Sequence, residues 1–239
     1  LGRALKDRMH LIIDTDYFRP QPIDTIEILQ SDRNPRVHFD RNIGDRTEEI
    51  REAHKELQEQ KVPFEKYIVA TYLVHGLDYL EGGKSKIGLK SGWPTKLEGH
   101  EAGSDAALIL PVSPRASKSI ITLSQALDQI TKERGAKDLD YFSSMMLAFK
   151  FASAYSGILN EAAVRQNEQY NENHYAAMDA VIDMTRAQFD DKKGLIAAGI
   201  EMANKGKTNK KLLGKFPGRW SFMRSLLENL SQQKNEAAR

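Results

Sequence analysis

Hydrophobic positions in the first 113 residues come in short runs that are typical of β-strands. His10–Phe18, Asp24–Leu29 and Arg36–Asp40 are apolar or alternating, and prolines and a turn-forming cluster separate them. The sequence therefore predicts three short strands near the N-terminal end of the chain.

Two helices and a long loop are expected to follow these strands. Arg46–Gln60 is mostly charged and carries a thin apolar stripe, which predicts a surface helix, whereas Phe64–Leu80 predicts a more buried one. Between Gly82 and Ser104 the chain is rich in glycine, which is typical of a long loop.

From residue 114 onward the hydrophobic period is that of helices, beginning with a start signal at Ser113 and Pro114. The stretch Leu139–Gln166 carries aromatic and methionine residues around nearly its whole circumference, so it predicts the buried central helix. Phe142, Met146 and Phe149 are its expected core residues.

These patterns together predict a mainly helical α+β protein with two regions. Residues 1–113 are expected to form a small strand-rich α+β lobe that carries the Gly-rich loop. Residues 114–239 form a C-terminal helical bundle that carries the basic segment described below.

Composition narrows the class of protein. The chain has 239 residues, of which 40% are hydrophobic and 28% charged, as in an ordered globular protein. It has no cysteine, which excludes disulfides, thiolate zinc sites and cysteine nucleophiles. No apolar run approaches the roughly 20 residues that a bilayer span needs. We expect a soluble protein that does not bind membranes, with the cytoplasm as the favoured location.

The clearest chemical signal is the segment Lys205–Arg224, called here the basic segment. It contains seven Lys or Arg and no Asp or Glu, although the formal net charge of the whole chain is only +2. Cations interleaved with aromatic rings suit a polyanion, because cations neutralise phosphates and rings stack on bases. The residues expected to bind nucleic acid are Lys205, Lys207, Lys210, Lys211, Lys215, Arg219, Trp220 and Arg224, with stacking on Phe216 or Trp220.

A structural reading of the same segment stays open. Lysines between two helices are commonly a solvated loop, and Trp220, Phe222, Leu226 and Leu230 have the spacing of core positions in a final helix.

A second candidate site is the carboxylate pair Asp14 and Asp16 in the run LIIDTD. Residues two apart share a face if a strand continues through them, and paired carboxylates hold divalent cations in hydrolases and phosphotransferases. Aspartates that form turns or caps are the alternative. No other motif suggests catalysis, and we expect no catalytic residue outside this pair and no cofactor.

The function we expect is nucleic-acid binding without catalysis, by a structural or assembly protein of the nucleoprotein or coat type that works as a homo-oligomer. RNA is favoured over DNA as the partner. The alternative is a metal-dependent hydrolase or phosphotransferase that uses Asp14 and Asp16. A third possibility is a scaffold that presents the basic segment to an acidic protein.

Overall fold

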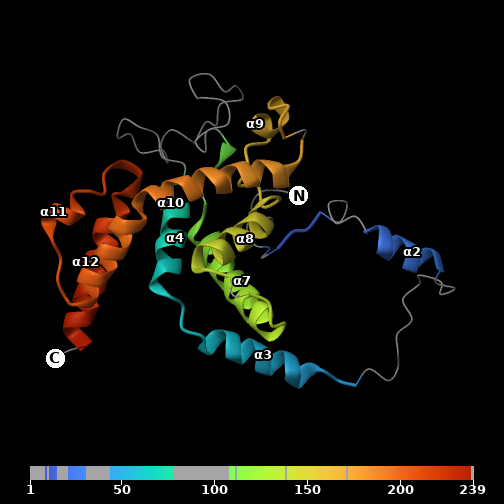
Figure 1. Ribbon diagram of the computed structural model, residues 1–239, viewed down its shortest axis with the longest axis horizontal. Helices are drawn as coiled ribbons and strands as arrows, with labels where there is room; N and C mark the ends of the chain where they lie inside the picture. The colour runs from blue at the N-terminus through green and yellow to red at the C-terminus, as the bar shows by residue number, and fades with distance from the viewer. Residues whose placement is uncertain are drawn as a thin grey trace. The chain divides into compact units, whose positions relative to one another are not determined.

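The protein is mainly helical. The computed structural model describes residues 9, 11–14, 21–30, 44–77, 108–110, 112–137, 139–170 and 172–237, and 73% of these residues are helical (Figure 1). Their one β feature is an isolated antiparallel bridge between Ile109 and Leu159. Because the described residues contain no strand or sheet, the predicted α+β class with a strand-rich lobe is wrong.

Where the structure describes the predicted strands, it shows none, and one of them is a helix for a local reason. Asp24–Leu29 lies inside helix α2 (Pro22–Gln30), where the Asp24 carboxylate accepts a hydrogen bond from the Gln21 backbone amide at 2.8 Å. The hydrophobic residues of this short run fit the period of two of a strand as well as the period of three to four of a helix. The acidic residue in the first turn favours the helix. Leu11–Asp14 forms no strand. The rest of His10–Phe18, all of Arg36–Asp40 and the Gly-rich loop lie outside the described residues.

By its internal contacts the chain falls into two compact units. One comprises Leu1–Ile12 and Val62–Arg239, and the other Ile13–Lys61. The smaller unit contains α2 and α3 (Thr47–Glu59), neither of which buries a residue, so the surface-helix prediction for α3 is confirmed. This grouping differs from the division expected at residue 113, because the earlier helix α4 (Phe64–His75) packs against α7 and α8.

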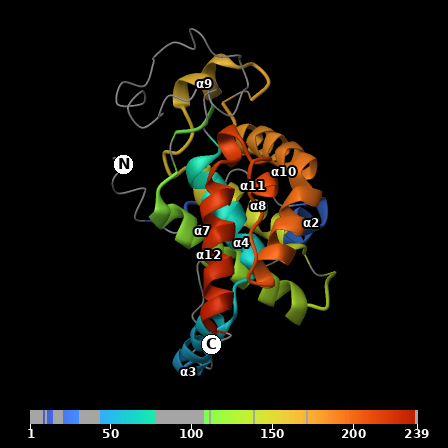
Figure 2. The same cartoon turned by 90° about the vertical axis from the view of Figure 1, so that its left-hand side faces the viewer.

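The larger unit is a helical bundle around α8. Helix α8 packs against α4, α7 and α10, while α12 packs against α10 and α4 (Figures 1 and 2). Gly199 of α10 lets α12 approach closely, since a Cβ there would stand 2.7 Å from a Leu227 methyl carbon. The elements after α4 are α7 (Pro114–Glu133), α8 (Tyr141–Ser153), α9 (Glu161–Gln166), α10 (His174–Asn204), α11 (Lys210–Leu213), the short 3₁₀ helix η3 (Gly218–Trp220) and α12 (Phe222–Ala237).

Side-chain caps set where these helices begin. The Ser113 hydroxyl accepts a hydrogen bond from the Ala116 amide at 3.1 Å, and Pro114 takes the first helical position, which confirms the predicted start of α7. Asp140 caps α8 and Asn173 caps α10 in the same way. The helix expected over Leu139–Gln166 is instead two helices, because α8 ends at Ser153 and α9 starts only at Glu161.

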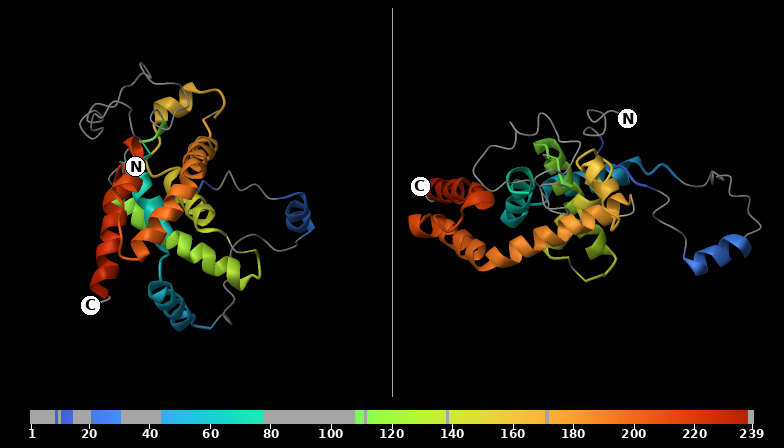
Figure 3. Two further views of the ribbon diagram at one scale, coloured as in Figure 1. Left: turned by 60° about the vertical axis from the view of Figure 1, so that its left-hand side comes forward. Right: turned by 90° about the horizontal axis from the view of Figure 1, so that it is seen from above.

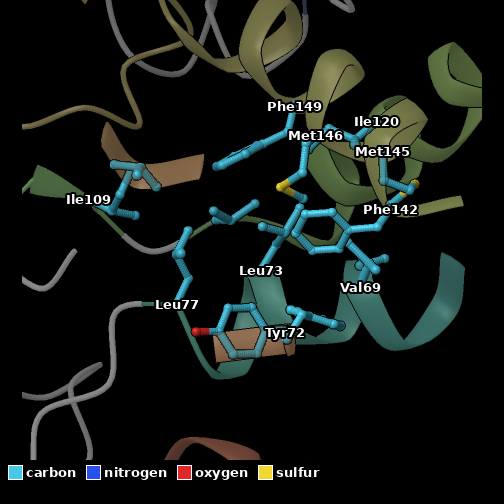
Figure 4. Packing of buried hydrophobic residues seen from close by; sticks show 14 of the residues in the cluster. Val69, Tyr72, Leu73, Leu77, Ile109, Ile120, Phe142, Met145, Met146 and Phe149 are labelled. Atoms are coloured by element: carbon cyan, nitrogen blue, oxygen red, sulfur yellow. The ribbon is translucent and has the colours of Figure 1, made fainter. Parts of the chain in front are cut away.

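The core lies where α4, α7 and α8 meet, as Figure 4 shows. Figure 4 shows Leu73 of α4 facing the α8 side chains, and Ile120 of α7 beside Met145 and Met146. The predicted core residues are confirmed, since Phe142, Met146 and Phe149 keep 7%, 2% and 0% of their surface exposed. Their spacing of four and three residues places them on one face of α8, while Leu147 of the same helix is exposed.

An ion pair between a buried lysine and a partly exposed aspartate links α4 to α7. Lys66 is 1% exposed, and its Nζ donates hydrogen bonds to Ser124 Oγ at 2.9 Å and to Asp128 Oδ2 at 2.6 Å. Because Lys66 stands near the start of α4 and Asp128 lies well along α7, the two helices run antiparallel. An ammonium buried this deeply requires such partners.

We expect Phe149→Ala to lower the free energy of unfolding by about 3–5 kcal/mol, because it leaves a cavity at the centre of the bundle. Urea denaturation followed by circular dichroism measures the loss. Leu147→Ala is the control, since Leu147 lies on the same helix and is 36% exposed. A loss below about 1 kcal/mol for Phe149→Ala, with the fold intact, would show that α8 is not the centre.

A second prediction concerns pH. Burial opposes ionisation of Asp140, but hydrogen bonds from Ser143 and Phe142 and the charge of Arg186 outweigh it and lower the pKa of this carboxyl. The ionised Asp140 carboxylate therefore stabilises the fold at pH values above the ordinary aspartate pKa. This stabilisation is lost as the pH falls through the lowered pKa of Asp140 in the folded protein. Asp140→Ala should cost about 0.5–2 kcal/mol of unfolding free energy at neutral pH, with the cost shrinking on acidification.

Urea melts across the acidic range measure this cost against Asp183→Ala, an exposed aspartate within α10. A cost for Asp140→Ala that does not change with pH would show that the carboxylate is not the cap.

Candidate nucleic-acid interface

The basic segment leaves α10 at a glycine turn. Gly206 has φ +67°, and the Lys207 amide donates a hydrogen bond to the Met202 carbonyl at 3.1 Å, which closes the end of the helix. The Asn235 side chain of α12 donates to the Gly206 carbonyl at 2.9 Å. The turn is therefore attached to the last helix of the bundle, beside the end of α10 (Figure 3).

Apolar residues of the segment face inward. Their helical spacing continues across the non-helical residues between α11, η3 and α12. Each is at most 7% exposed, and successive members are three or four residues apart. From Leu213 onward the segment is thus packed against the bundle. In the segment these residues are Leu213, Phe216, Trp220 and Met223, and the row continues beyond it with Leu227 and Leu230 of α12.

The tryptophan expected to stack on bases is part of the core. Trp220 is 2% exposed, and its ring centroid lies 4.9 Å from that of Tyr72, 5.0 Å from that of Phe189 and 5.9 Å from that of Phe222. Phe216 is fully buried. Neither ring offers a free face to a base: Trp220 holds the core position that the alternative reading described, and Phe216 is buried as well.

Three of the seven cations make contacts within the protein. Arg219 Nη1 donates to the Tyr72 hydroxyl and Arg224 Nε donates to the Leu213 carbonyl, each at 3.2 Å. Lys205 pairs with Glu201 one turn earlier, and this hydrogen bond lowers the pKa of the Glu201 carboxyl. These groups help to fix the segment.

The other four cations form what we call the lysine group: Lys207, Lys210, Lys211 and Lys215. All four are exposed. No carboxylate of the described residues forms an ion pair with any of them. Asn209 caps α11 by accepting from the Lys211 amide at 2.8 Å, which fixes the backbone between Lys210 and Lys211. The structure therefore presents unpaired positive charge on an ordered backbone.

The carboxylate pair is not brought together by the described residues. Asp14 is partly buried and belongs to no strand, and Asp16 lies outside the described part of the chain. Among the residues that can be described, no three His, Asp or Glu side chains gather as a metal site would require. A metal centre at Asp14 and Asp16 stays a prediction without support from the geometry.

Sequence reasoning missed a groove between α4 and α7 with a volume of about 550 Å³. Its lining is mostly apolar and includes Val62, Ala70, Val74 and Ile121. The sequence of α4 held a signal for this groove, because its apolar residues are not confined to one face. The helices α7, α8 and α12 that pack against α4 leave some of these residues at the groove. Within the described chain, no helix combines the length and apolarity that a membrane crossing requires.

No protein-family model, curated protein or solved structure matches this chain.

If Trp220 is a core residue, Trp220→Ala should lower the free energy of unfolding by about 3–5 kcal/mol. Trp220→Phe should cost less than about 1.5 kcal/mol, since it keeps an aromatic ring and Nε1 has no hydrogen-bond partner among the described residues. Urea denaturation measures both. Full stability of Trp220→Ala, together with weakened nucleic-acid binding, would instead assign the ring to the interface.

Proposed function

We propose that the protein binds nucleic acid, without catalysis, by neutralising phosphates with the lysine group. One observation carries the proposal: four exposed lysines, which pair with no carboxylate of the described residues, lie in a segment that has no acidic residue, in a chain whose formal net charge is only +2. Because no ion pair with a described carboxylate has to break, each lysine can meet a phosphate and release the counterion bound there.

The buried side of the segment supports the same proposal. Leu213 and Phe216 anchor the chain on either side of Lys215, which lowers the cost of ordering the backbone at this lysine on binding. Lys205, Arg219 and Arg224 add to the positive potential, although their present contacts are within the protein. In this form of the proposal binding is electrostatic, and the stacking first expected from Phe216 and Trp220 is not part of it.

The finer parts of the proposal rest on composition and architecture alone. They are a preference for RNA over DNA, a place in a homo-oligomeric nucleoprotein or coat assembly, and a cytoplasmic location. Binding to an acidic protein is the competing use of the same lysines, and a comparison of ligands separates the two.

Replacing Lys207, Lys210, Lys211 and Lys215 together with Gln should weaken binding to every sequence. The slope of log affinity against log salt should flatten by about 0.7 per lost contact on single strands, so by up to about 2.8 on single-stranded RNA, and by about 0.9 per contact on duplex DNA. Fluorescence anisotropy over a salt series, with single-stranded RNA, single-stranded DNA and a duplex, measures these slopes.

The matched control replaces Lys61, Lys132, Lys137 and Lys193, four exposed lysines outside the basic segment, with Gln. It makes the same change in net charge and should leave the slope nearly unchanged. Equal effects of the two quadruple variants would mean that net charge, not the lysine group, drives binding. Natural protein that binds an acidic polypeptide but none of the nucleic acids would favour the competing use.

A further inference from the structure

The groove between α4 and α7 has one end that differs in charge from the rest of its lining. Both helices belong to the larger unit, and the described residues that line the groove all lie between Val62 and Gln125. Because α4 and α7 run antiparallel, His75 at the end of α4 lies on the same side as Ser117 and Lys118, which belong to the first two turns of α7. We call this side the cationic end of the groove.

Three features favour an anion at the cationic end. Lys118 is exposed there and forms no ion pair with a carboxylate of the described residues, and the His75 ring adds a hydrogen-bond donor. The first turn of α7 holds no acidic residue, so no carboxylate within that turn balances the partial positive charge of the helix terminus. None of the described lining residues is Asp or Glu.

A buried hydroxyl at the same end lacks a partner. Ser117 lines the groove and is 6% exposed, and its Oγ makes no hydrogen bond within the described chain. Leaving such a group unpaired costs free energy, and most buried polar side chains in native proteins do have a partner. A carboxylate oxygen bound at the cationic end would give this hydroxyl the acceptor that it lacks.

The rest of the groove suits an apolar chain. Its lining is mostly apolar and includes Val62, Tyr67 and Ala70 towards the start of α4. Its volume of about 550 Å³ lies within the roughly 300–1,000 Å³ of pockets that bury small molecules. In such pockets the apolar surface provides affinity, and a few polar groups at one place fix the orientation of the ligand.

We propose that this groove binds a small amphipathic anion, a molecule with one apolar chain and one terminal carboxylate. The chain lies along the apolar lining, and the carboxylate lies at the cationic end, near Lys118, His75 and the start of α7. The separation of charge and apolar surface along the groove selects this ligand over a neutral or cationic one with the same chain. The proposal does not depend on nucleic-acid binding, since none of its residues belongs to the basic segment.

Three probes with the same ten-carbon chain test the charge preference: decanoate, decylammonium and decanol. Isothermal titration calorimetry, below the concentration at which each probe forms micelles, measures their affinities for the whole chain. Decanoate should bind more tightly than decylammonium. Lys118→Glu should reverse this preference and change the ratio of the two affinities by at least about tenfold, because it places a like charge beside the carboxylate. The affinity for decanol should stay nearly unchanged.

Lys132→Glu is the matched charge control. Lys132 is an exposed lysine of the same helix that is not part of the groove lining, so this variant changes net charge equally. It should leave the ratio of decanoate to decylammonium affinity nearly unchanged.

A second pair of variants tests whether the probes occupy the groove. Thr122 is an exposed lining residue, so Thr122→Trp fills part of the groove, whereas Thr122→Ala keeps it open. Thr122→Trp should weaken binding of all three probes by at least about tenfold, and Thr122→Ala should not. In methyl NMR spectra of the natural protein, decanoate should shift the signals of Val74 and Ile121, which line the groove.

Four results would overturn the proposal. They are equal binding of decylammonium and decanoate, equal effects of Lys118→Glu and Lys132→Glu, decanoate binding that Thr122→Trp leaves intact, and the absence of both binding heat and methyl shifts with decanoate. Binding to vesicles of anionic phospholipid without binding of free decanoate would also overturn it, because the groove would then recognise a lipid surface.

Discussion

The aromatic contact between Tyr72 and Trp220 is the interaction on which the rest of the candidate interface depends. Tyr72 of helix α4 is fully buried, and its ring also meets Phe189 of α10 and Phe222 of α12. Its hydroxyl accepts a hydrogen bond from Arg219. One side chain thus joins three helices to the basic segment. Aromatic pairs of this kind add about 0.5–1.5 kcal/mol each beyond the area that they bury.

This anchoring divides the basic segment into an inner and an outer side. The inner side supplies stability, because Leu213, Phe216 and Trp220 are removed from water. The outer side carries lysines, which lose little by staying solvated and gain only when a polyanion arrives. A segment built in this way keeps its charges in place without using its aromatic rings for binding. The same residues that suggested an interface for stacking therefore support an electrostatic one.

Much of the helical bundle could be predicted from the sequence, because long helical periods and strong caps are local signals. The start of α7 at Ser113 and the burial of Phe149 are examples. Short segments do not carry such a signal. The hydrophobic pattern of Asp24–Leu29 fits a strand and a helix equally well, and the structure shows that it is a helix. The buried Lys66 and the inward ring of Trp220 depend on partners 62 and 148 residues away in the chain, respectively Asp128 and Tyr72, and no local pattern encodes such pairs.

The most direct test of this account compares one single-stranded RNA with an abasic strand of the same length and phosphate number. If the lysine group binds phosphates and the rings stay buried, both strands should bind with equal affinity and equal salt slopes. Stacking is worth about 1–3 kcal/mol per base, or roughly five- to 150-fold in affinity. A preference of that size for the strand with bases would contradict the account and return Phe216 or Trp220 to the interface.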